Sequence, residues 1–275
     1  SKSILMFFFP ILLGSFLQQL YGTTDALIVG RYVNKEALAA IGATTYIINI
    51  LIGFFVGLSA GAAVIISQFY GANKGKDLSD SVHTAIALSL VSGVIIMIVG
   101  IVFSPMILKI MNTPADIIEP STTYLRVYFL GSIPVLIYNM GSSILRAVGD
   151  SKSPLYVLIV CTIANVVLDI LFVAVFKMGI FGAALATLLA QVISAAVVIT
   201  MLMRAEFSYK LDLKKISFHQ KELTAMLKIG LPTGFQAVMY YLSNMIVQSS
   251  VNSFGTDTVA AWTVFTTNDN FYWMV

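Results

Sequence analysis

Long runs of apolar residues alternate along this chain with short clusters of polar and charged residues. An α-helix rises about 1.5 Å per residue and the hydrocarbon core of a bilayer is about 30 Å thick, so roughly 20 apolar residues make one crossing. Measured against that length, the pattern predicts seven full transmembrane helices and the start of an eighth near Val259. The seven predicted helices cover residues 4–30, 37–70, 82–104, 121–148, 154–177, 180–203 and 225–254.

The composition also argues against an ordinary soluble domain. Of the 275 residues, 58% are hydrophobic and 11% are charged, whereas a soluble domain carries roughly 25% charged residues. The first apolar run is longer than the hydrophobic region of a signal peptide, so we predict that it is a helix of the mature protein. We therefore expect an all-α, polytopic protein that spans the cell membrane in contact with its lipids.

The distribution of positive charge predicts the orientation of the helices. With the N-terminus in the cytoplasm, 11 of the 16 Lys and Arg residues fall on the cytoplasmic side. The positive-inside rule therefore favours a cytoplasmic N-terminus. The net charge of +3 reflects these loop residues, so it gives no reason to expect a nucleic-acid partner.

One long polar segment, residues 204–224, separates the sixth and seventh predicted helices. Its alternating charged and apolar residues predict a cytoplasmic linker, which either lies on the membrane surface or is simply solvated. Beyond the linker the beginning of the chain is repeated, because a shift of 222 residues aligns Pro10 with Pro232 and Ala39 with Ala261.

This repeat predicts two lobes, as in transporters built from internal duplications. Residues 1–203 form a six-helix lobe, and residues 225–275 begin a second lobe of the same kind. Because the second lobe stops inside its second helix and the chain has no initiating Met, we expect a fragment of a twelve-helix protein.

The cysteine and histidine residues give little support to cofactor chemistry. Cys161 is the single cysteine and lies in an apolar run, which excludes a disulfide within the chain and a cysteine-based metal site. His83 and His219 fall in or beside charged loops, where we expect them to be solvated rather than to bind zinc or haem. No cofactor is expected.

Ionisable side chains inside predicted membrane helices are candidates for function, because burying them there costs several kcal/mol unless they face a partner or a wet cavity. Asp25 lies about 9 Å below the outer end of the first helix, and Asp169 about 12 Å below that of the fifth. Asn165 is one turn before Asp169 on the same face. Thr187 lies about 10 Å below the outer end of the sixth helix, so the four side chains share one layer.

Oxygen ligands of this kind suit Na⁺, and a protonatable carboxyl group suits H⁺. The sequence does not choose between the two ions. The structural alternative is that Asp25 caps its helix near the surface and that Asp169 bonds a neighbour. Further polar residues that can line a cavity are Gln18, Gln19, Tyr124, Tyr138, Asn139 and Gln191.

A set of short segments carries more specific information. The set comprises Pro10 followed by Asp25-Ala-Leu-Ile-Val-Gly30-Arg31, then Gln68-Phe-Tyr-Gly71-Ala72, Leu145-Arg146-Ala-Val-Gly149-Asp150-Ser-Lys152-Ser-Pro154, Asn165-Val-Val-Leu-Asp169 and Gly179-Ile-Phe-Gly182-Ala-Ala-Leu-Ala-Thr187. Taken together, these segments resemble the multidrug and toxic compound extrusion (MATE) family. The resemblance spans the whole chain and includes the prokaryotic members of the family.

The resemblance implies a monomeric transporter of two pseudosymmetric lobes that exports small organic cations or drugs by alternating access, in exchange for H⁺ or Na⁺. Its first-lobe cation site matches Asp25, Asn165 and Asp169, which would also be the Na⁺ ligands. The threonine on the sixth helix matches Thr187. The resemblance further implies cavity positions at Gln18, Tyr124 and Asn139, and a first helix that bends near Pro10.

Two features limit the alternatives. The repeat places Asp25 opposite Val247, so cation coupling would rest on the first lobe alone. A flippase for lipid-linked precursors shares the fold, but it should hold a pyrophosphate with several cationic residues, and we assign none to the predicted helices. An enzyme would need a nucleophile with its base, or a set of metal ligands, and the sequence predicts neither.

Overall fold

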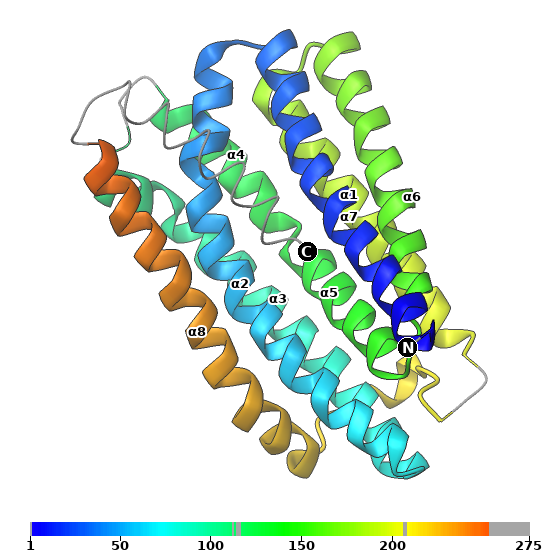
Figure 1. The fold of residues 1–275 in the computed structure, drawn as a ribbon. Helices are drawn as coiled ribbons and strands as arrows, with labels where there is room; N and C mark the ends of the chain where they lie inside the picture. The colour runs from blue at the N-terminus through cyan, green and yellow to red at the C-terminus, as the bar shows by residue number, and fades with distance from the viewer. Residues whose placement is uncertain (1, 112, 114–116, 206–207, 253–275) are drawn as a thin grey trace.

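The computed structural model describes residues 2–111, 113, 117–205 and 208–252, and within these ranges every regular element is helical (Figure 1). The elements are α1 (Lys2–Tyr32), α2 (Lys35–Gly71), α3 (Gly75–Ile110), α4 (Ile118–Leu130), α5 (Ser132–Ala147), α6 (Lys152–Asp169), the π-helix η1 (Ile170–Val175), α7 (Gly179–Met203), the 3₁₀-helix η2 (Leu213–Lys215) and α8 (Gln220–Asn252).

The helices lie side by side, and successive spans run in opposite directions when α4 with α5, and α6 with η1, are each counted as one span (Figure 1). In the described part of the chain, α2, α3, α6 with η1, and α7 are long and apolar enough to cross a membrane, and the pair α4 and α5 forms a fifth such unit if counted as one span. The predicted all-α, polytopic fold is therefore confirmed. The predicted spans 37–70 and 180–203 agree closely with α2 and α7.

The predicted helix 121–148 is not continuous, and this expectation was wrong. It is broken at Gly131 into α4 and α5, whose axes differ by 51°. The Gly131 amide bonds the Tyr128 carbonyl oxygen at 2.9 Å, which closes a turn. Pro134 follows three residues later and has no N–H to donate, so the first turn of α5 begins without that bond.

The predicted helix 154–177 changes its winding after Asp169. Residues Ile170–Val175 form a π-helix, and a bond from the Phe176 amide to the Leu171 carbonyl oxygen at 2.9 Å spans five residues. Single π-helical turns inside α-helices are rare and often lie at functional sites. The wider turn here begins directly after an intramembrane carboxylate.

The linker is folded against the lobe and is not simply solvated. The Leu211 amide bonds the Leu202 carbonyl oxygen at 3.0 Å, and the Leu211 side chain is 1% exposed within the main apolar core, together with Met226. The helix that follows starts at Gln220, five residues before its predicted start, with Glu222 in its first turn. An acidic residue there is favoured by the helix dipole.

Helices α2 and α8 make a close seam of glycines. A Cβ atom added at Gly57 would lie 2.4 Å from the Gly234 backbone nitrogen, and one added at Gly61 would lie 2.5 Å from that of Gly230. No Cβ atom fits at such distances, so the absence of side chains is what lets the two backbones touch. The seam joins α8, the helix after the linker, to the six-helix lobe.

Candidate functional site: the central cavity and a buried polar layer

A cavity of about 550 Å³ lies at the centre of the helices. Six helices contribute to its wall, and most of the polar groups on it are uncharged amides and hydroxyls. It is lined by Gln18, Asn49, Ile52, Gly53, Val56, Gly57, Ala60, Tyr128, Val135, Tyr138, Asn139, Ser142, Arg146, Gln191, Thr233, Ala237 and Tyr241. A cavity of this size matches the volume of small-molecule sites.

The cavity includes most of the cavity residues that the sequence indicated. Gln18 and Asn139 both line it, and the Asn139 amide nitrogen donates to the Val135 carbonyl oxygen at 2.8 Å. Tyr124 does not line it. Its side chain is buried, and its ring stacks on that of Tyr128 at 6.3 Å between centroids, so it lies behind the wall that Tyr128 forms.

Arg146 is a cavity residue that the sequence analysis missed. Its position near Gly149 and Asp150 suggested a cytoplasmic loop, but it lies in the last turn of α5. There it lines the central cavity and a smaller cavity of about 90 Å³ beside Pro10. The expectation that no cationic side chain lies within the helices was therefore wrong at this position.

A separate layer of buried polar side chains lies toward the end of α6 and the first half of α7. Asn165 and Asp169 are both 0% exposed, and Thr187 is 4% exposed. The amide atoms of Asn165 and the hydroxyl of Thr187 have no hydrogen-bond partner among the described residues. A buried polar group left without a partner costs about 1–3 kcal/mol, so this layer is polar enough to receive a ligand.

The packing of α6 on α7 explains why these residues meet. The Cys161 thiol lies 3.4 Å from the Ala190 carbonyl oxygen and donates to it, which fixes the register of two antiparallel helices. Asn165 lies one turn after Cys161 on α6, and Thr187 lies one turn before Ala190 on α7. Because the two helices are antiparallel, both steps lead in the same direction, and Asn165 and Thr187 lie at the same height. Small side chains on α7, such as Ala183 and Ala186, are fully buried and let the helices approach closely.

Helix α1 packs against α6 and reaches the height of the buried polar layer. A Cβ atom at Gly14 would lie 3.8 Å from the Leu158 side chain, and α1 and α6 run in the same direction. Eleven residues beyond these two positions are Asp25 and Asp169, which therefore lie at equal height. The Asp25 side chain lies outside the described residues. Pro10 lies inside α1, which continues through it as one helix.

Comparison with known proteins decides the family. The family model MatE matches residues 10–171, which is more than half of the chain. The chain belongs to this family. The resemblance drawn from the sequence is thereby confirmed.

Two curated relatives come from Bacillus subtilis (strain 168). The probable multidrug resistance protein YoeA is 30% identical over 270 residues, which cover 96% of this chain and 58% of YoeA. The probable multidrug resistance protein YpnP is 31% identical over 265 residues, which cover 95% of this chain and 58% of YpnP. The chain thus spans a little more than half the length of these relatives.

Solved MATE transporters have the same fold as this MatE chain. A MATE crystal structure in a bent conformation has a TM-score of 0.86 at 26% identity, covering 95% of this chain and 59% of that one. An outward-facing multidrug resistance transporter of the family has a TM-score of 0.85 at 26% identity, covering 96% and 58%.

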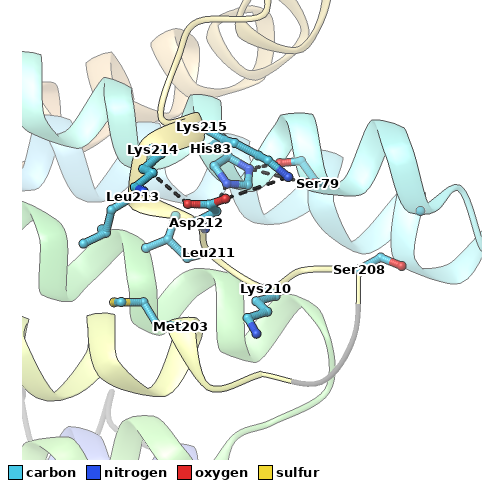
Figure 2. Close-up of a pocket in the computed structure, with 11 residues that line it drawn as sticks. Ser79, His83, Met203, Ser208, Lys210, Leu211, Asp212, Leu213, Lys214 and Lys215 are labelled. Atoms are coloured by element: carbon cyan, nitrogen blue, oxygen red, sulfur yellow. Dashed lines mark hydrogen bonds and ion pairs between the residues drawn. The ribbon is translucent and has the colours of Figure 1, made fainter.

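A second, larger hollow of about 850 Å³ in this MatE chain lies where the linker meets α3 (Figure 2). One side of it is formed by the linker lysines Lys210, Lys214 and Lys215. It lies at the end of the molecule that holds the N-terminus, away from the buried polar layer. We therefore take the smaller central cavity, whose wall is built by six helices, as the candidate functional site.

His83 fastens the linker to α3 at this hollow. Its ring is 3% exposed; Nδ1 donates to the Ser79 carbonyl oxygen at 2.7 Å, and Nε2 accepts from the Asp212 amide at 3.1 Å (Figure 2). His219 is tied to the same helix, since its amide donates to the Thr84 hydroxyl at 3.0 Å. The expectation of a solvated side chain was wrong for His83, because its linker partner lies 129 residues away in sequence, whereas the His219 side chain is still 35% exposed.

Replacing His83 with Leu should therefore loosen the linker. The Asp212 amide would lose its partner, at a cost of about 1–3 kcal/mol, and trypsin should cut faster after Lys210, Lys214 and Lys215. Cleavage of the full-length protein in detergent measures this effect. His83→Gln keeps a hydrogen-bonding side chain and should be cut more slowly than His83→Leu. Equal cleavage of the parent and both variants would show that His83 does not hold the linker.

Proposed function

We propose that the full-length protein is a secondary active multidrug efflux transporter, which exports small organic cations in exchange for H⁺ or Na⁺ by alternating access. The observation that carries the proposal is the presence of a central cavity and a separate, buried polar layer in one bundle of helices. The names of the relatives support drug export. We further propose a monomer in the cell membrane with a cytoplasmic N-terminus, in keeping with the distribution of Lys and Arg.

The coupling ion would bind in the buried polar layer. Asp169 supplies a carboxylate, and Asn165 and Thr187 supply oxygen atoms that have no partner among the described residues. Asp25 is proposed to complete the set from α1. Carboxylate, amide and hydroxyl oxygens are the ligands that Na⁺ takes, and the carboxylates can instead take up H⁺. The cluster therefore fits either ion.

The same helices join the polar layer to the cavity. On α7, Thr187 is one turn from Gln191, which lines the cavity. On α1, Asp25 is seven residues from Gln18, or about 10 Å, and Gln18 also lines the cavity. An ion that draws α1 toward α6 would move the cavity wall, and it shifts the conformational balance only by its difference in affinity between the two states.

A flippase for lipid-linked precursors is the alternative within the same fold. A pyrophosphate carries several negative charges and calls for several cationic side chains. In the described wall of the central cavity, Arg146 is the one charged residue. That wall suits a drug-sized molecule with large uncharged surfaces better than a pyrophosphate.

The test is efflux of a fluorescent organic cation from vesicles that contain the full-length protein, under separately imposed pH and Na⁺ gradients. Efflux driven by one gradient and collapsed by its ionophore would support the proposal and identify the ion. Efflux that responds to neither gradient would contradict antiport. Flipping of a labelled lipid-linked precursor without any drug efflux would favour the alternative.

A further inference from the structure

The described wall of the central cavity carries one positively charged side chain, that of Arg146. Arg146 lies in the last turn of α5 and lines both the central cavity and the smaller cavity. The smaller cavity is also lined by Pro10 and Gln18 of α1 and by Pro154 of α6. The guanidinium group thus lies where α1, α5 and α6 meet, at the end of the cavity nearer the N-terminus.

This guanidinium has no acidic partner in the described part of the chain. Its hydrogen bond within the protein runs from Nη2 to the Ser143 hydroxyl of its own helix at 3.2 Å. The described salt bridges all lie elsewhere, between the linker, the start of α8 and the first turns of α3. Arginine offers five N–H donors in a fixed plane, so most of them are available to a ligand.

The surrounding wall adds aromatic rings and neutral donors to this charge. Tyr128, Tyr138 and Tyr241 line the cavity with Asn139 and Ser142. The tyrosine rings offer flat apolar surfaces, and the amide and hydroxyl groups can donate further hydrogen bonds to an anion. The described wall contains no Asp or Glu, so an anionic group entering it meets attraction without a competing carboxylate.

We propose that the central cavity binds amphiphilic organic anions, with their carboxylate or sulfonate on Arg146 and their aromatic part against the tyrosines. The inference rests on the proposed drug-efflux function and extends its substrate class beyond organic cations. A planar guanidinium pairs with a carboxylate through two parallel hydrogen bonds, which a lysine ammonium does not reproduce. The single guanidinium group of Arg146 can therefore pair with one carboxylate or sulfonate group of a ligand.

The test uses two dyes that share a xanthene ring system and differ in charge, fluorescein as the anion and rhodamine 123 as the cation. Binding of each dye to the purified full-length protein is measured by fluorescence polarisation. Arg146→Gln should weaken fluorescein binding by at least about tenfold, because the variant loses the charge-assisted hydrogen bonds to the carboxylate of the dye. Arg146→Lys should retain part of the affinity, and rhodamine 123 should bind Arg146→Gln as well as the parent or better.

The matched control is Arg126→Gln, which removes an exposed arginine on α4 that does not line the cavity. It should leave the binding of both dyes unchanged. Fluorescein that fails to bind the parent, or that binds a folded Arg146→Gln protein as tightly as the parent, overturns the anion site. The proposed efflux function is tested separately, by measuring the export of rhodamine 123 from vesicles that contain the parent protein. The absence of export there would contradict efflux without bearing on the anion site.

Discussion

Replacing Asp169 with Asn will remove ion-driven efflux while leaving the protein folded. The substitution keeps the size of a side chain that is fully buried but removes the negative charge that an ion in this layer would neutralise. We expect gradient-driven transport to fall by at least about tenfold, which corresponds to about 1.4 kcal/mol of lost ion binding. Efflux from vesicles under the coupling gradient is the measurement, with a thermal melt as the test of folding.

Asp25→Asn should have an effect in the same direction, because both carboxylates are assigned to one site. Glu119→Gln is the matched control, since Glu119 is an exposed acid in the first turn of α4, and it should leave efflux unchanged. Unaltered efflux in both aspartate variants would refute the site in this lobe. The search for the coupling residues would then move to the part of the protein that follows α8.

Adding a single methyl group at Gly57 will separate α2 from α8. The new Cβ atom of Gly57→Ala would lie 2.4 Å from the Gly234 nitrogen and 2.5 Å from its Cα atom. Both contacts are with backbone, which cannot rotate away as a side chain can, so the helices must move apart. Overpacking of this kind costs about 1–3 kcal/mol, and we expect a lower melting temperature and reduced efflux.

The same helix supplies the control for this effect. Gly42→Ala adds an identical methyl group to α2 at a position with nothing within 4 Å, and the change in helix propensity is of the same kind. It should melt at or above the temperature of the parent. If Gly57→Ala and Gly42→Ala melt and transport alike, the α2–α8 contact does not control stability or transport.

The sequence predicted those parts of the fold that depend on a long regular pattern. The apolar runs gave the spans of α2 and α7 nearly to the residue, because the length of a membrane crossing is set by the bilayer. It could not predict the break at Gly131, since a Gly and a nearby Pro are tolerated inside many membrane helices. The π-helix after Asp169 leaves no trace in composition, because it depends on how α6 packs against its neighbours.

The site residues divide in a similar way. Asn165, Asp169 and Thr187 stand out in sequence because polar side chains are rare inside apolar helices, and all three are buried in the structure. Arg146 was missed because it lies one residue before the end of α5, where a charged side chain is easily assigned to the following loop. His83 was missed because its partner, the Asp212 amide, is a backbone group that no side-chain pattern reveals.

The fastening of the linker to α3 has a mechanical consequence for α8. The Thr84 hydroxyl holds the His219 amide, and α8 begins at the next residue. The start of α8 is therefore held in place and can act as a fulcrum, that is, a pivot point for the helix. Its far end lies about 50 Å away at 1.5 Å per residue. A tilt of about 10° around that fulcrum would move Gly230 by less than about 3 Å and the far end by about 9 Å. A small rotation at the linker is enough to swing the opposite end of α8 through a distance comparable to the width of a helix.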